Sequence, residues 1–137
     1  MNISRRQFVR MSLAAFAVGR AALASGAPSE AEAPVKAGLA TDYARDGIYD
    51  RFQSQGFFII RRGPALLAIS SWCTHRRCTL AAEPGSTFYC KCHGSTFNAD
   101  GRVTEGPARR DLPFFATAVS DTGHLLVFLQ RIVGMTK

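Results

Sequence analysis

The chain has 137 residues, of which 47% are hydrophobic, and a formal net charge of +7. This length suffices for one domain and an N-terminal extension, and the composition is ordinary for a globular domain. Four of the 17 basic residues lie before Ser25, where there is no acidic residue, so the rest of the chain has 13 basic and 10 acidic residues and a charge of +3. Since no nucleic-acid motif accompanies the basic residues, we expect no nucleic-acid partner.

The first 24 residues resemble a twin-arginine export signal. Residues 4–10 contain the arginine pair, an apolar run follows over residues 11–18, and residues 22–24 offer an Ala-x-Ala cleavage site. The run has about eight strongly apolar positions, whereas a membrane-spanning helix needs about 20. We therefore favour cleavage over a retained membrane anchor, and we expect the protein in the periplasm or at the outer face of the inner membrane.

Residues 25–47 are predicted to form a flexible tether. Residues 27–40 are mostly Ala, Pro, Ser, Glu and Gly, with few large apolar side chains. Such a segment cannot bury enough apolar surface to fold alone. The folded domain is expected to begin at Ile48 and to cover residues 48–137.

Short strands are predicted throughout this domain. Residues 56–61 and 65–71 have strand-like composition on either side of a Gly-Pro turn, and residues 87–89 lead as a strand into Cys90. A final hairpin is predicted for residues 116–129, with its turn at residues 121–123. Because no 11-residue window after Ile48 has convincing helical periodicity, the sequence predicts an all-β domain of short antiparallel strands.

All four cysteines and two of the three histidines lie in two short segments. The segments are Cys73-Thr74-His75-Arg76-Arg77-Cys78 and Cys90-Lys91-Cys92-His93-Gly94-Ser95. Each offers thiolates and an imidazole, which select iron–sulfur, zinc or copper over hard cations. The alternatives are two disulfides, for which four cysteines allow three pairings, and a Cys₂His₂ zinc site. A structural disulfide does not require a histidine nearby, so the pattern favours a metal centre.

Both segments resemble the cluster-binding motifs of Rieske iron–sulfur proteins, Cys-Thr-His-x-x-Cys and Cys-x-Cys-His-Gly-Ser. Residues 106–108, Gly-Pro-Ala, resemble the loop that covers the cluster in this family, and the resemblance runs from about Phe57 to Phe128. It implies an antiparallel β sandwich with a small cluster-binding subdomain of two loops. It also implies one [2Fe–2S] cluster per chain.

The resemblance also assigns the cysteines and histidines. Cys73 and Cys90 would bind one iron, and His75 and His93 would bind the other. Imidazole ligands raise the reduction potential well above the value of about −400 mV that is typical of all-cysteine plant-type clusters. The remaining residues, Cys78 and Cys92, would form a disulfide between the loops, which an oxidising compartment permits. Oxygenase-type Rieske ferredoxins lack that pair, so its presence indicates the respiratory branch.

Further positions would cover the cluster or tune its potential. Gly106 and Pro107 would belong to the covering loop, and the Ser95 hydroxyl would donate to a bridging sulfide. Phe97 stands where high-potential relatives have a tyrosine that donates to the sulfur of the first cysteine, here Cys73. Because phenylalanine lacks this donor, we expect a lower potential than in relatives with the tyrosine.

Five basic residues are expected to surround the exposed histidine edge. They are Arg76, Arg77, Lys91, Arg109 and Arg110. Quinol-oxidising relatives usually have Leu-Gly at positions 76 and 77 and proline at 91. The charges predict docking on an acidic partner, or compensation for the missing tyrosine hydroxyl, and the alternative is an ordinary solvated surface.

The predicted function is that of an exported Rieske electron-transfer protein without a substrate pocket of its own. The leading assignment is the iron–sulfur subunit of a quinol–cytochrome c reductase-like complex, with a cytochrome b/c1-like redox partner and quinol as a candidate reductant. In that case the complex or the N-terminal anchor would hold the protein at the membrane. The alternatives are the small subunit of a periplasmic oxidoreductase of the arsenite oxidase type, with its large subunit as partner, a Rieske ferredoxin of a ring-hydroxylating oxygenase, and a structural zinc module.

Overall fold

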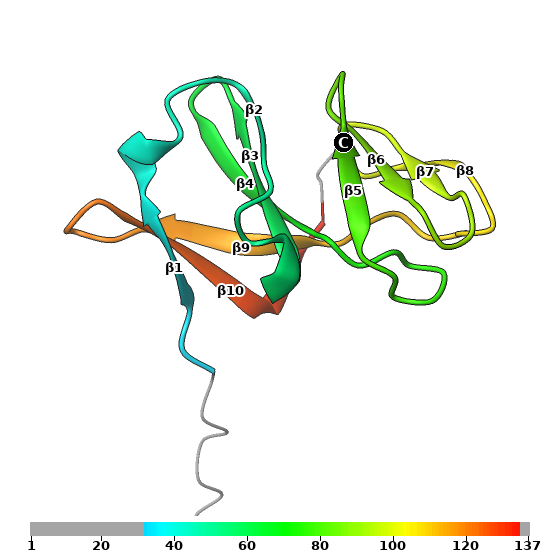
Figure 1. Cartoon of the computed structure of the whole chain (residues 1–137). Helices are drawn as coiled ribbons and strands as arrows, with labels where there is room; N and C mark the ends of the chain where they lie inside the picture. The colour runs from blue at the N-terminus through cyan, green and yellow to red at the C-terminus, as the bar shows by residue number, and fades with distance from the viewer. Residues whose placement is uncertain (1–31, 135–137) are drawn as a thin grey trace, which may run out of the picture.

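The computed structural model describes residues 32–134, so the predicted export signal and the first residues of the predicted tether lie outside the described residues. The described chain forms two antiparallel sheets, which confirms the predicted all-β fold (Figure 1). The larger sheet has six strands in the order β1 (Val35–Leu39), β10 (His124–Val133), β9 (Phe114–Val119), β4 (Ala65–Ser70), β3 (Phe57–Arg62) and β2 (Gly47–Tyr49). The smaller sheet has four, in the order β5 (Leu80–Glu83), β6 (Thr87–Cys90), β7 (Thr96–Phe97) and β8 (Val103–Glu105).

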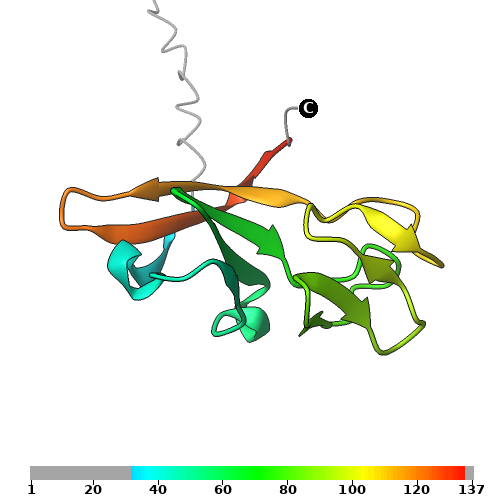
Figure 2. The ribbon, with the colours of Figure 1, turned by 90° about the horizontal axis from the view of Figure 1, so that it is seen from above.

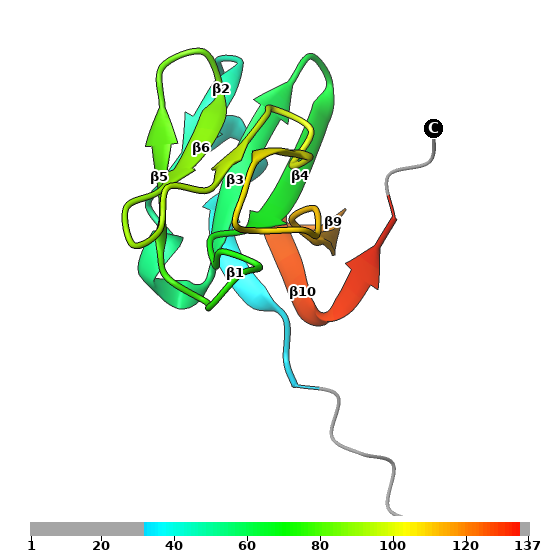
Figure 3. The same ribbon diagram turned by 90° about the vertical axis from the view of Figure 1, so that its right-hand side faces the viewer.

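Two short 3₁₀ helices, η1 (Ala40–Asp42) and η2 (Gln53–Gln55), precede β2 and β3. Within residues 32–134, no helix has the length and apolar character that crossing a bilayer requires. Seen from above, the smaller sheet lies beside the larger one (Figure 2). Seen from the side, the smaller sheet lies in front of the larger sheet (Figure 3).

β3 is buried on both faces and separates two apolar cores, because successive side chains of a strand point to opposite sides. Phe57 and Ile59 belong to the core between β3 and the β1–β10 side of the larger sheet. Phe58 and Ile60 belong to the second core, which joins the two sheets. The second core also contains, from the cysteine segments and the smaller sheet, Cys73, Leu80, Phe88, Cys90 and Phe97. The first cysteine of each segment is therefore anchored in a packed apolar core.

The ordered domain begins before the predicted boundary at Ile48. β1 pairs with β10, and Gly47 of β2 pairs with Arg61 of β3. Tyr43, which is only 2% exposed, donates its hydroxyl proton to the carbonyl of the buried Ala37. The predicted tether over residues 25–47 is thus wrong for residues 35–47, because backbone pairing and one buried tyrosine compensate for the low apolar content of this segment.

Most of the predicted strands are confirmed to within two or three residues. The segments predicted at 56–61 and 65–71 are β3 and β4, and Arg62 pairs with Ala65 across the Gly-Pro turn. The predicted final hairpin is β9 and β10, but β10 continues to Val133, with a register shift between Phe128 and Ile132. β1, β5, β7 and β8 were not predicted, since they are short and lack runs of β-branched residues.

Candidate metal centre

The two cysteine segments form loops with the same backbone hydrogen-bond pattern. The first loop, residues 73–78, joins β4 to β5, and the second loop, residues 90–95, joins β6 to β7. In each, the N–H of the first cysteine donates to the carbonyl five residues later, and its carbonyl accepts from the N–H four residues later. The bonds are Cys73 N to Cys78 O and Arg77 N to Cys73 O, both 2.8 Å, and Cys90 N to Ser95 O, 2.8 Å, and Gly94 N to Cys90 O, 2.9 Å.

Cys73 and Cys90 are free cysteines and are both 1% exposed. Burial raises the pKa of the Cys73 thiol; the backbone at His75 opposes the shift, the neighbouring Cys90 thiol adds to it, and the Ser95 hydroxyl opposes it. Without a cation, this environment therefore favours the neutral thiol. A bound metal ion reverses the preference, since a coordinating thiol is deprotonated.

The two predicted histidine ligands lie next to each other. The ring centroids of His75 and His93 are 4.8 Å apart, and the rings are perpendicular. Burial lowers the pKa of His75, and the positive charges of His93 and Arg76 lower it further, so the neutral imidazole that binds metals is favoured. Nδ1 of His75 is buried and has no hydrogen-bond partner in the described part of the chain.

A disulfide between Cys78 and Cys92 joins the two loops, as the resemblance implied. Its sulfurs and the Cys90 sulfur all lie within 4.8 Å of one another. The disulfide sulfurs offer no thiolate, so the metal-binding thiols of this region are those of Cys73 and Cys90. The bond fixes the spacing of the loops that carry the histidines.

The segment after β8 is hydrogen-bonded to both loops. The Ala108 N–H donates to the Ser95 hydroxyl oxygen at 3.0 Å, and the Thr74 hydroxyl donates to the Arg110 carbonyl at 2.6 Å. Ser95 is fully buried and Ala108 nearly so, whereas Gly106 and Pro107 are exposed. The segment thus covers the loops through its backbone. The sequence analysis gave Thr74 no role, although it stands between two predicted ligands.

Phe97 is fully buried in the core that contains Cys73 and Cys90. Its ring packs in the apolar region where the resemblance places a tyrosine, and no hydroxyl is available at this position. The Ser95 hydroxyl, which accepts from Ala108, keeps its own proton to donate toward the buried thiols.

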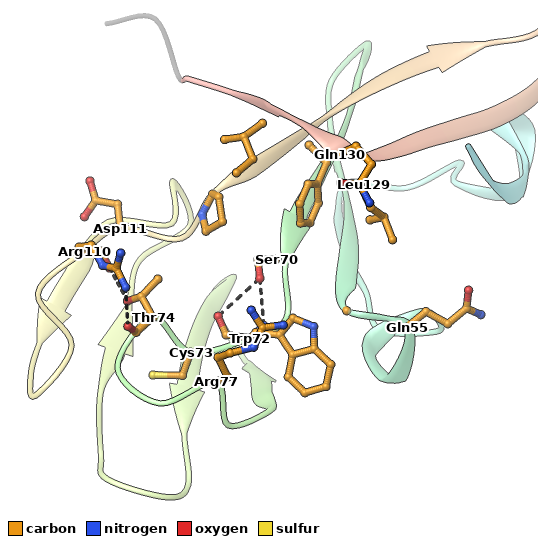
Figure 4. Close-up of a pocket in the computed structure, with 14 residues that line it drawn as sticks. Gln55, Ser70, Trp72, Cys73, Thr74, Arg77, Arg110, Asp111, Leu129 and Gln130 are labelled. Atoms are coloured by element: carbon orange, nitrogen blue, oxygen red, sulfur yellow. Dashed lines mark hydrogen bonds between the residues drawn. The ribbon is translucent and has the colours of Figure 1, made fainter. Parts of the chain in front are cut away.

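All five predicted basic residues are exposed, but they do not all face the histidines. Arg76 lies close enough to His75 to lower its pKa. Arg77 instead turns back, with its guanidinium carbon 5.9 Å from the centre of the Trp72 ring. A guanidinium nitrogen of Arg110 lies 3.4 Å from the Thr74 carbonyl oxygen. The expected ring of charge around the histidine edge is therefore split, since Arg77 and Arg110 lie on the Trp72 side of the first loop (Figure 4).

These residues fit an iron–sulfur centre. Two buried thiols occupy one side, two neighbouring imidazoles occupy the other, and a buried imidazole nitrogen has no protein partner within residues 32–134. Buried polar atoms are usually hydrogen-bonded, so such an orphan calls for a ligand. Soft sulfur and imidazole donors are those that iron–sulfur centres of mixed ligation use.

The chain belongs to the Rieske [2Fe–2S] domain family, whose model matches residues 35–116. The match includes both loops, the disulfide and the covering segment. The protein is therefore a Rieske iron–sulfur electron-transfer protein, and its cofactor is a [2Fe–2S] cluster.

Its similarity extends to subunits of respiratory and photosynthetic complexes. It is 41% identical to a cytochrome b6-f complex iron–sulfur subunit of Gloeobacter violaceus over 42% of this chain and 31% of that protein. It is 41% identical to a ubiquinol–cytochrome c reductase iron–sulfur subunit of Bradyrhizobium diazoefficiens over 34% of this chain and 28% of that protein. The crystal structure of the plasma membrane Rieske protein PetC3 from Synechocystis PCC 6803 matches with a TM-score of 0.52 and 30% identity, over 68% of this chain and 97% of that one.

The similarity to curated proteins is confined to part of their length. A carotenoid phi-ring synthase of Chlorobaculum tepidum is 37% identical over 53% of this chain, but the match covers only 11% of that protein. The chain spans less than half the length of each of these curated relatives. The similarity therefore defines the iron–sulfur domain.

Proposed function

We propose that the protein is exported and serves as the iron–sulfur subunit of a quinol–cytochrome c reductase-like complex. The observation that carries the proposal is the Cys78–Cys92 disulfide between the two loops. Such a bond persists in an oxidising compartment, and it is the feature that separates the respiratory branch from oxygenase ferredoxins. Similarity to the ubiquinol–cytochrome c reductase subunit supports the same assignment.

Within this proposal Cys73 and Cys90 hold one iron, and His75 and His93 hold the other. The bound cluster supplies a one-electron carrier. The buried cysteines anchor the centre in the core, whereas His93 is exposed and His75 half-buried, so the histidine edge faces the solvent. Electrons are accordingly expected to enter and leave at that edge.

Export would follow from the arginine pair in residues 4–10. Replacing Arg5 and Arg6 together by lysine should retain the protein in the cytoplasm, because the twin-arginine pattern depends on that pair. Cell fractionation with an immunoblot measures this directly. Unchanged export of the double variant would reject the twin-arginine assignment while leaving the electron-transfer assignment intact.

An EPR-monitored redox titration of the holoprotein tests the branch of the family. Rieske centres lie between about −150 and +300 mV, and all-cysteine plant-type centres lie near about −400 mV. A midpoint at or above zero supports quinol-level electron transfer. A midpoint at the negative end of the Rieske range would assign the protein to the oxygenase-ferredoxin class.

Isolation of the assembled complex tests the partner. A C-terminal affinity tag, applied to detergent-solubilised membranes of the source organism, should bring down b-type and c-type haem, seen in the optical spectrum. The exposed basic residues favour one second candidate, the small subunit of a periplasmic oxidoreductase. Recovery of a haem-free oxidoreductase subunit would select that alternative.

A further inference from the structure

A groove of about 680 Å³ lies beside the first loop, on the side away from the disulfide-linked second loop (Figure 4). One wall is formed by Trp72, Cys73 and Thr74 of the first loop and its approach. The other wall is formed by the end of β10 and by β9, including Phe115 and Ile132. The groove therefore separates the cluster-binding subdomain from the larger sheet, and it is not the histidine edge.

The β10 wall of the groove is apolar and open to solvent. The register shift after Phe128 places Ile132 opposite Phe115, and Ile132 is 68% exposed. Leu129 is half-buried in the same wall, and the half-buried Trp72 faces it from the first loop. An exposed isoleucine alone is ordinary, but here it continues a concave apolar surface.

The rim of the groove is positively charged. Arg77 and Arg110 both line it, and within residues 32–134 neither guanidinium forms an ion pair with a carboxylate. Asp111 is the acidic residue among the lining side chains, and one of its carboxylate oxygens accepts the Val103 N–H at 3.0 Å. Arg76 and Arg109, next to the lining arginines in the chain, are exposed and add positive charge.

We propose that this groove docks an acidic segment of the redox partner, with an apolar side chain inserted between Trp72 and Ile132 and carboxylates placed against Arg77 and Arg110. The charge selects the occupant: a quinol is neutral and would leave both guanidinium groups without a counter-charge. An acidic segment with an apolar anchor satisfies both walls, and complementary charge also accelerates association. The inference rests on the proposed function for the statement that the partner is a redox protein.

The position of the groove gives such docking a consequence. Cys73 and Thr74 belong to its wall, and His75 follows them in the chain. A partner held there contacts the loop that carries the proposed ligands without covering the histidine edge itself. The groove thus fixes the orientation of the partner and leaves the edge free for electron exchange.

The test uses the holoprotein and a fluorescein-labelled peptide with alternating acidic and apolar residues, Asp-Leu-Glu-Phe-Asp-Leu-Glu, followed by fluorescence anisotropy. Two control peptides carry serine in place of Leu and Phe, or lysine in place of Asp and Glu. The first peptide should bind more tightly than either control, and its affinity should fall as salt is raised, since the contacts include exposed charges.

Matched variants locate the binding. Replacing Arg77 and Arg110 together by glutamine should weaken the affinity about fivefold, whereas Arg45→Gln, at an exposed arginine of the larger sheet's β1–β2 connection, should not change it. Ile132→Ser should weaken it about tenfold, whereas Val119→Ser, at a residue that is 55% exposed and does not line the groove, should not.

Equal binding of the three peptides, no binding, or equal effects of the groove and control variants would overturn the proposal. Displacement of the peptide by decylubiquinol, with no effect of the arginine substitutions, would assign the groove to a quinol and also overturn it. Anisotropy requires no electron transfer, so a negative result together with a midpoint above zero rejects the groove alone. Specific binding with a strongly negative midpoint instead rejects the proposed function.

Discussion

Arg77 and Gly94 occupy equivalent positions in the two loops. Each follows the first cysteine of its loop by four residues, and each donates its N–H to the carbonyl of that cysteine. Both have left-handed backbone conformations, with φ of 58° at Arg77 and 81° at Gly94. Glycine adopts this conformation readily, whereas a residue with a Cβ is strained there. The first loop therefore carries backbone strain that the second loop avoids.

This strain can be measured by comparing Arg77→Gly with Arg77→Ala. Both variants lose the contact of the guanidinium with Trp72, but only alanine keeps the unfavourable φ. The glycine variant should be more stable than the alanine variant by about 1 kcal/mol in urea unfolding followed by circular dichroism. The neighbouring Arg76 does not have a positive φ, so there glycine should be less stable than alanine. An alanine variant as stable as the glycine variant at position 77 would contradict the strain.

The sequence predicted the loops well because the chemistry depends on residue type and close spacing. Cysteine and histidine positions, the disulfide and the covering segment all follow from three short motifs. The Trp72 groove depends instead on the register of β10 against β9, which brings Ile132 opposite Phe115 from 17 residues away. Local sequence does not determine such a register. For the same reason the edge strand β1, which is stabilised by β10, was assigned to the tether.

Removing the disulfide should destabilise the smaller sheet more than the larger one. The bond closes a loop with a sequence separation of 14 residues, and loops of this size typically contribute about 3 kcal/mol. The double variant Cys78→Ser/Cys92→Ser is preferred, because the Cys90 sulfur lies within 4.8 Å of both disulfide sulfurs and could pair with a single remaining cysteine. Hydrogen exchange should accelerate at the Cys90 and Gly94 amides and change little in β3. Uniform acceleration in both sheets would show that the bond stabilises the fold as a whole.

Phe97→Tyr should raise the midpoint potential. The new hydroxyl would lie in the core that contains Cys73 and Cys90, where a donor stabilises the more negative reduced centre. An EPR-monitored titration of both holoproteins measures the shift. Phe58→Tyr is the control, since Phe58 is equally buried in the same core but belongs to the larger sheet, so it should cost stability without changing the potential. No shift in Phe97→Tyr would contradict the proposed ligand assignment around Cys73.

Tyr43→Phe should lower stability at neutral pH by about 1 kcal/mol, because it leaves the buried Ala37 carbonyl without its donor. Burial raises the pKa of Tyr43; Arg51 opposes the shift, and Asp42 and Tyr49 add to it. Thermal unfolding at pH 8 measures the loss. Tyr89→Phe, at an exposed tyrosine, is the control and should leave stability unchanged.

The same pair of proteins should converge at alkaline pH. Below about pH 10, the ordinary pKa of tyrosine, Tyr43 is protonated in both the folded and the unfolded chain. Above it, the unfolded chain releases the phenolic proton while the folded chain, with its raised pKa, keeps it. The folded state then binds more protons, so the stability that Tyr43 provides falls as pH rises toward the folded pKa. Unfolding midpoints measured from pH 8 to 11 should therefore decline more steeply in the native protein than in Tyr43→Phe, and parallel declines would show that Tyr43 ionises equally in both states.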